Sequence, residues 1–224
     1  MNSTATFAET LRLHGVRTVA MFGDSITVGM AASTPSQAWP ALFAAATNTR
    51  VINRAISGTV LQNSPDADGT PRADNGLSRC HRDLIAEPAD AICILYGYND
   101  ARYMAAPDSF NLFGFRRDYA VLVSCLLGAG FAPEAIAVGS PPFACAKGFA
   151  IGSAGFTGQT RDGFGAYVGV VGAIARQFGL AYAPVYEVMA ARPDGSLASP
   201  DVTHPNDEGH RLIARAFLEA GIPR

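Results

Sequence analysis

The sequence has little positive charge. Lys147 is its only lysine, the arginines are scattered along the chain, and the formal net charge is −2. Proteins that bind nucleic acid present a basic stripe that neutralises phosphates, and no such stripe is visible here. Charged residues make up 16% of the chain and hydrophobic residues 49%, which excludes a disordered or collagen-like protein. We therefore expect a compact protein without a nucleic-acid partner.

Long apolar runs and a leader pattern are also missing. No run approaches the roughly 20 apolar residues of a membrane-spanning helix, and residues 1–10 show no basic segment followed by an apolar one. Of the four cysteines, Cys93 and Cys125 lie in apolar runs, where we expect the thiol to be a small buried hydrophobe. A disulfide framework is the less favoured alternative. These features predict a cytoplasmic protein with no membrane partner.

Short apolar runs alternate with longer helical patterns along the 224 residues, a length that suits one domain, residues 1–224. The runs expected as buried strands are residues 17–22, 50–52, 91–95, 135–138 and 180–183. The expected helices are residues 36–46, capped by Ser36, and 75–86, 108–127, 163–178 and 207–220. This alternation predicts a three-layer α/β/α fold around a mainly parallel five-stranded sheet. Such sheets bind ligands at the carboxyl ends of their strands.

Two stretches interrupt the alternation, residues 59–75 and residues 141–162. Both are expected to be long loops, which in a compact domain usually form functional lids or rims, or else mobile segments.

Ser25 follows the first expected strand directly, in the segment Gly23-Asp24-Ser25. It would therefore lie at the carboxyl end of a strand, where open α/β sheets place their sites. Serine becomes a nucleophile only when a base takes its proton, a carboxylate holds the base and donors receive the oxyanion. The alternative is an ordinary turn stabilised by the Asp or Ser side chain.

A carboxylate and an imidazole lie near the other end of the sequence, in Asp201-Val202-Thr203-His204-Pro205. A spacing of three within a turn lets Asp201 reach the nearer ring nitrogen of His204, which leaves the farther nitrogen facing the serine. Pro205 is expected in the first turn of the last helix, so that His204 lies on the loop before it. The alternative is that Asp201 caps the helix and His204 is a surface histidine.

Four segments together resemble the SGNH hydrolases, also called GDSL-type esterases and lipases. They occur in the order that the family shows and span residues 23 to 205: GDSI at 23–26, NRAISG at 53–58, GYND at 97–100 and DVTHP at 201–205. A further segment, AWPAL at 38–42, is similar to the one after the nucleophile in the bacterial thioesterase and lysophospholipase members. Arg54 and Ala55 differ from the small residues that often precede the glycine of the second segment.

The resemblance implies a role for five residues. Ser25 would be the nucleophile, His204 the general base and then acid, and Asp201 the group that orients the imidazole. The oxyanion donors would be the backbone N–H groups of Ser25 and Gly58 and the side-chain amide of Asn99. Glycine suits this position because it lacks a Cβ and adopts positive φ. The alternatives are a turn glycine and an asparagine that caps a helix.

The expected activity is therefore hydrolysis of a small-molecule ester, with a short acyl group, through an acyl-serine intermediate and without metal or cofactor. Three alternatives stay open: an acyltransferase, a thioesterase or lysophospholipase with the same three residues, and a catalytically silent glycan-binding protein. The resemblance is compatible with each of these activities, because proteins of one fold act on different substrates.

Other motifs are weaker. Residues 163–169 nearly match a dinucleotide fingerprint, but no strand precedes them, so we expect glycines at the start of a helix. Adjacent Cys80 and His81 lack a second pair of ligands for a metal. Residues 66–69 start like a calcium loop without the later ligands, and are expected to be a polar turn. We expect an ordinary loop thiol at Cys145 and surface histidines at the two positions His14 and His210.

Overall fold

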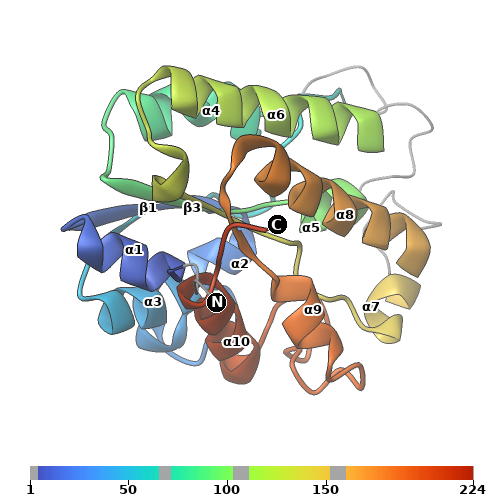
Figure 1. Cartoon of the computed structure of the whole chain (residues 1–224). Coiled ribbons are helices and arrows are strands. Elements are labelled where there is room, and N and C mark those ends of the chain that lie inside the picture. The colour runs from blue at the N-terminus through green and yellow to red at the C-terminus, as the bar shows by residue number, and fades with distance from the viewer. Residues whose placement is uncertain (1–4, 66–71, 103–110, 152–159, 224) are drawn as a thin grey trace.

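One parallel sheet of five strands forms the centre of the protein (Figure 1). The computed structural model describes residues 5–65, 72–102, 111–151 and 160–223. The sheet has the order β2-β1-β3-β4-β5. Its strands are β1 (Thr18–Gly23), β2 (Arg50–Asn53), β3 (Ala91–Leu95), β4 (Ile136–Gly139) and β5 (Ala181–Ala183). Each begins and ends within one residue of the predicted range, and the α/β prediction is confirmed.

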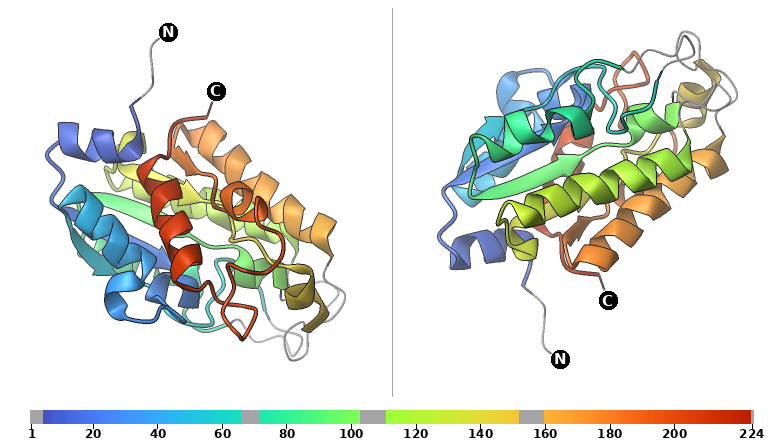
Figure 2. Two further views of the ribbon diagram at one scale, coloured as in Figure 1. Left: turned by 90° about the horizontal axis from the view of Figure 1, so that it is seen from below. Right: turned by 90° about the horizontal axis from the view of Figure 1, so that it is seen from above.

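Helices cover both faces of the sheet, which gives the three layers (Figure 2). On one face, α6 (Leu112–Gly128) packs against α4 (Gly76–Cys80) and α8 (Arg161–Phe178). On the other, α10 (Asp207–Leu218) packs against α1 (Phe7–Leu13), α3 (Trp39–Thr47) and α9 (Val185–Ala190). Because both faces are covered, the central strand β3 is buried at every position.

Short helices and turns connect these layers. They are α2 (Ser25–Val28), η1 (Pro35–Gln37), the π-helical turn η2 (His81–Ile85), α5 (Tyr98–Arg102), η3 (Pro133–Ala135) and α7 (Ala146–Ile151). The expected loop 141–162 thus contains α7 and the first turn of α8, which begins two residues earlier than predicted because Thr160 caps it. Part of this loop, part of the loop 59–75 and the expected start of a helix at 108 lie outside the described residues.

The predicted start of one helix and the predicted position of Pro205 within another are wrong. Ser36 does not cap a helix: it lies in η1, and α3 begins at Trp39 without a side-chain cap. Pro40, which has no N–H to donate, fits only the first turn and so places the start beside it. Pro205 lies outside the last helix, which Asn206 caps through a bond from the N–H of Gly209.

Burial also differs from expectation at His210 and Cys125. His210 is fully buried rather than at the surface, with its Nε2 3.1 Å from the Met30 carbonyl oxygen. Cys125 is exposed although it lies in an apolar run, because its position on α6 faces away from the core. Cys145 is buried. All four cysteines are free, and no helix among the described residues is long and apolar enough to cross a membrane.

Candidate active site

Ser25 is the first residue of α2, directly after the carboxyl end of β1. The turn is tight because the buried Asp24 caps α2, with its Oδ1 accepting from the N–H of Ile26 at 2.9 Å. A Cβ at Gly23 would lie 2.2 Å from Thr27 Oγ1 and 2.6 Å from the Leu95 carbonyl oxygen, so only glycine fits there. The Ser25 side chain is held at the edge of the sheet that carries sites in this fold class.

The fold brings Ser25 to His204 and Asp201 across 179 residues of sequence. His204 Nε2 lies 2.9 Å from Ser25 Oγ, and His204 Nδ1 lies 2.7 Å from Asp201 Oδ2. A proton on Nδ1, bonded to the carboxylate, leaves Nε2 free to accept the serine proton. The three side chains thus have the geometry of a nucleophile, a base and the group that orients the base.

The carboxylate of Asp201 is fixed by the turn that carries it. Its Oδ1 accepts from the N–H of His204 at 2.9 Å, the N–H of Thr203 at 2.8 Å and the hydroxyl of Ser199 at 2.8 Å. Val202, between these residues, adopts a left-handed φ of 55°. Desolvation acts to raise the pKa of Asp201, but these bonds and the one to the imidazole hold it well below its ordinary value. The group is therefore a charged carboxylate that faces His204.

Two further predicted residues lie at the same edge of the sheet, Gly58 on the loop after β2 and Asn99 in the short helix after β3. Gly58 is exposed with φ of 78°, and no other atom lies within 4 Å of a Cβ built on it, so its conformation rather than crowding requires glycine. Asn99 lies in α5 after β3 and is 7% exposed. Its Nδ2 donates to the Thr59 carbonyl oxygen at 2.9 Å, which leaves the second amide hydrogen for a ligand.

A small pocket adjoins His204. It encloses a cavity of about 20 Å³, and Phe143, Met189, Leu197 and Val202 lie among its mostly apolar lining. A cavity of that size holds roughly one water molecule. A larger hollow, of about 450 Å³, lies at the opposite, amino-terminal edge of the sheet, beside the Asp90 that precedes β3. Parallel sheets do not place their chemistry at that edge, so we assign the site to the edge at Ser25.

The competing motifs find no support in the described residues. Residues 163–169 lie inside α8, and no strand precedes them directly. Burial raises the pKa of the Cys80 thiol to about 12, which opposes the thiolate that a metal or a nucleophilic role requires. Within the described ranges, no three His, Cys, Asp or Glu side chains are grouped to hold a metal ion. Residues 66–69 lie outside these ranges.

Sequence analysis did not find the polar residues that support the site through hydrogen bonds. Ser199 bonds Asp201, and the buried Arg79, Tyr96 and Thr59 lie beneath the loops that carry Ser25 and Gly58. The only sequence signal is an arginine within the expected helix 75–86, and nothing nearby shows what it contacts.

The arrangement of five parallel strands with a serine, a histidine and a carboxylate at their carboxyl edge is that of an α/β serine hydrolase. The GDSL-like lipase/acylhydrolase family model matches residues 21–212, so the chain belongs to this family. This confirms the SGNH/GDSL resemblance and the expectation that the chain is an enzyme of the SGNH serine hydrolase class.

Solved structures of similar fold support the architecture. One is a lipase/acylhydrolase from Enterococcus faecalis, with a TM-score of 0.67 and 19% identity over 93% of this chain and 99% of that one. An acetylxylan esterase from Geobacillus stearothermophilus has a TM-score of 0.65 and 22% identity over 90% and 92%. TesA has a TM-score of 0.63 and 20% identity over 89% and 95%. No protein with a curated description matches the sequence.

Proposed function

We propose that this protein hydrolyses carboxylic esters through an acyl-serine intermediate, with Ser25 as the nucleophile. The observation that carries the proposal is the pair of hydrogen bonds made by His204. Its Nε2 lies 2.9 Å from Ser25 Oγ, and its Nδ1 lies 2.7 Å from Asp201 Oδ2. Both are ordinary hydrogen-bond lengths, so the base is within reach of the proton that it must remove.

The proposed reaction has two halves. In the first, His204 Nε2 takes the proton of Ser25 Oγ while the oxygen attacks the ester carbonyl carbon. The backbone N–H groups of Ser25 and Gly58 and the side-chain amide of Asn99 receive the charge on the oxyanion. His204 then donates its proton to the leaving alcohol as the carbon–oxygen bond breaks. In the second half, water attacks the acyl-serine with His204 as base, and the acid leaves.

We propose a short acyl group for the substrate. The small size of the apolar pocket that the described residues form beside His204 supports this, because a short chain fits beside the base more readily than a long one. The solved structures of similar fold include an acetylxylan esterase, whose name indicates an acetyl group, and also TesA and a lipase. The alternatives with the same three residues are a thioesterase or lysophospholipase and an acyltransferase; a silent glycan-binding protein is the less favoured alternative.

We also propose that the chain is a single domain, residues 1–224, that acts in the cytoplasm without metal, cofactor, nucleic acid or membrane. The low positive charge and the four free cysteines support this. Activity that survives a chelator and a reducing agent is the expected result, and loss of activity in EDTA would overturn the metal-free mechanism.

A series of p-nitrophenyl esters from acetyl to palmitoyl tests the function and the acyl group together. We expect the purified protein to turn over the acetyl ester fastest and Ser25→Ala to show no turnover. Faster turnover of the long chains would contradict the short acyl group. Added alcohol distinguishes hydrolysis from transfer, because a transferase would give mainly the new ester, and a failure of a fluorophosphonate to label Ser25 would favour the silent protein.

A further inference from the structure

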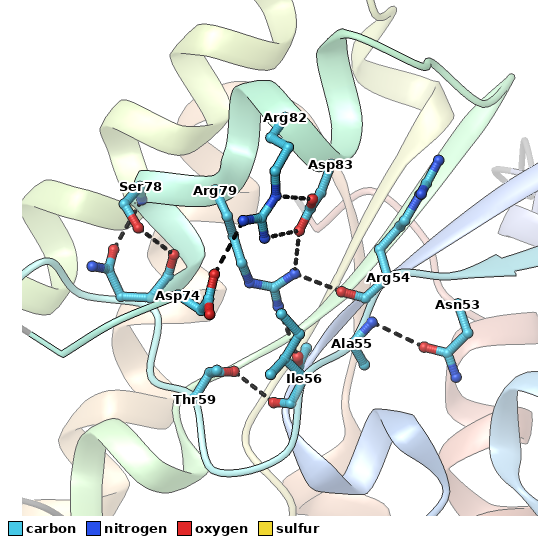
Figure 3. A network of polar contacts seen from close by, with 12 residues as sticks. Asn53, Arg54, Ala55, Ile56, Thr59, Asp74, Ser78, Arg79, Arg82 and Asp83 are labelled. Carbon is cyan, nitrogen blue, oxygen red and sulfur yellow. Dashed lines mark hydrogen bonds and ion pairs between the residues drawn. The ribbon is translucent and has the colours of Figure 1, made fainter.

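A buried arginine lies beneath the loops of the active site. Arg79, on α4, is 2% exposed and lies between Asp83 and Arg54 (Figure 3). Its guanidinium lies 4.1 Å from the centre of the Phe22 ring. Asp83, one turn later, lies 2.7 Å from its Nη1 and balances the charge. An apolar side chain would fill this volume without the cost of removing a cation from water. A buried ion pair is therefore weak evidence for a role in stability, and the contacts of Arg79 suggest a further role.

Arg79 joins two backbone segments that carry proposed catalytic groups. Its Nη2 donates to the Gly23 carbonyl oxygen at 3.1 Å, two residues before the nucleophile. Its Nη1 donates to the Arg54 carbonyl oxygen, at the start of the loop that leads to Gly58. The N–H of Ile56 donates to the same Gly23 oxygen at 3.1 Å, so the two segments are also joined directly.

A hydrogen-bond chain of fixed direction continues from Arg79 to the turn around Gly58. A guanidinium only donates, so the Tyr96 hydroxyl accepts from Arg79 and gives its own hydrogen to Thr59 Oγ1, 3.0 Å away. Thr59 Oγ1 then donates to the Ile56 carbonyl oxygen at 2.7 Å. Ile56 and Thr59 are the ends of the turn that contains Gly58, and the bond between them, the last of this chain, closes the turn (Figure 3).

The same turn also holds the third proposed donor. Asn99 Nδ2 donates to the Thr59 carbonyl oxygen at 2.9 Å, which fixes the amide. Each of the three proposed oxyanion donors is therefore close to a residue of the network. Gly23 lies two residues before Ser25, and Thr59 follows Gly58 directly. The carbonyl oxygen of Thr59 accepts the bond from Asn99. Preorganised donors stabilise an oxyanion because they need not move when the charge forms.

We propose that Arg79 is a positioning residue that sets the geometry of the oxyanion hole through Tyr96 and Thr59. It touches no substrate atom and acts through the backbone of the two loops. The inference rests on the proposed function, because it needs an oxyanion to form at Ser25. It predicts that damage to the network lowers kcat and leaves KM nearly unchanged, since the donors matter most in the transition state.

Tyr96→Phe is the main test, since it removes only the hydroxyl of a side chain that is 1% exposed. We expect kcat for p-nitrophenyl acetate to fall roughly tenfold, less than for loss of a donor itself, with KM within about twofold. Arg79→Lys, which keeps the charge but loses the fork geometry, should retain more activity than Arg79→Met. Arg215→Gln is the control: it removes an exposed cation on α10 that pairs with Glu219 and takes no part in the network, and we expect unchanged kcat.

A boronic acid inhibitor that binds the serine gives a second readout that a merely structural role would not move. Its tetrahedral oxygen occupies the oxyanion hole, so its affinity should fall by the same factor as kcat/KM in each variant, while the variants stay folded by circular dichroism. If Arg79→Met does not fold, the kcat and boronate affinity of Tyr96→Phe and Thr59→Val still test the role of the network.

The outcomes separate this inference from the proposed function. A wild-type protein without esterase activity, or an active Ser25→Ala, contradicts the proposed function. An active wild-type protein whose Tyr96→Phe and Arg79→Lys variants keep wild-type kcat and boronate affinity overturns the role of Arg79 alone. A rise in KM with unchanged kcat overturns it as well, since the network would then serve substrate binding.

Discussion

Asp24 caps the nucleophile helix with a carboxyl group that is 2% exposed, and this makes the stability of the protein depend on pH. Desolvation raises its pKa from 3.8 to about 7, with the nearby Asp100 adding to the rise and the bond from Ile26 and the charge of Arg79 opposing it. Burial of the charged form therefore destabilises the folded protein.

The sign follows from proton binding. Between pH 4 and 7 the folded protein holds a proton on Asp24 that the unfolded chain has released, so stability falls as the pH rises through this window. A shift of about three pKa units corresponds to about 4 kcal/mol in full, of which about 3 kcal/mol falls between pH 5 and 8. Asp24→Asn keeps an oxygen for the N–H of Ile26 and carries no charge.

Urea unfolding of the two proteins at pH 5 and pH 8 measures this. We expect the variant to gain about 3 kcal/mol relative to wild type between these two pH values. His210, whose pKa is lowered mainly by burial, and Asp100, whose pKa burial raises to about 6, are present in both proteins, so their own effects on stability largely cancel in the difference. The carboxylates with lowered pKa, such as Asp201, are charged in both states throughout this range. A difference that stays constant from pH 5 to 8 would refute the cost of burying Asp24.

Three further substitutions test the site. Asn99→Ala should lower kcat by roughly 10²–10³-fold with little change in KM, and unchanged kcat would refute its role as a donor. Asp201→Asn should lower kcat by roughly 10⁴-fold, because the imidazole loses its orienting charge; near wild-type kcat would exclude that role. Gly23→Ala places a Cβ 2.6 Å from the Leu95 carbonyl oxygen and should cost roughly 1–3 kcal/mol in urea unfolding. Gly165→Ala is the control, because no atom lies within 4 Å of a Cβ built at Gly165, and it should not destabilise the protein. An equal loss of unfolding free energy in the two variants would contradict the steric argument.

The sequence predicts those parts of the fold that depend on local pattern. The buried strands are short apolar runs, and their ends follow from the residues themselves, as at Ala91–Leu95. The contact of His204 with Asp201 is also local, because three residues separate them within one turn. The contact of His204 with Ser25 needs the fold, and the parallel order of the strands supplies it.

The interactions that sequence analysis missed are those between distant segments. Arg79 contacts backbone oxygens 25 and 56 residues away, and no spacing rule predicts such pairs. His210 is predicted at the surface because no partner lies at a useful spacing in the sequence, but packing of α10 on α3 buries it near Trp39. Cys125 shows the opposite error, since a short apolar run does not tell which face of the helix meets the core.

Mass spectrometry of a covalent adduct shows which residue is the nucleophile. The protein is treated with a fluorophosphonate, digested and sequenced by fragmentation, with Ser25→Ala as the control. The account predicts one modified residue, Ser25, with loss of esterase activity in step with labelling, and no label on the variant. Label on another residue, or full activity after complete labelling of Ser25, would contradict the assignment of the nucleophile.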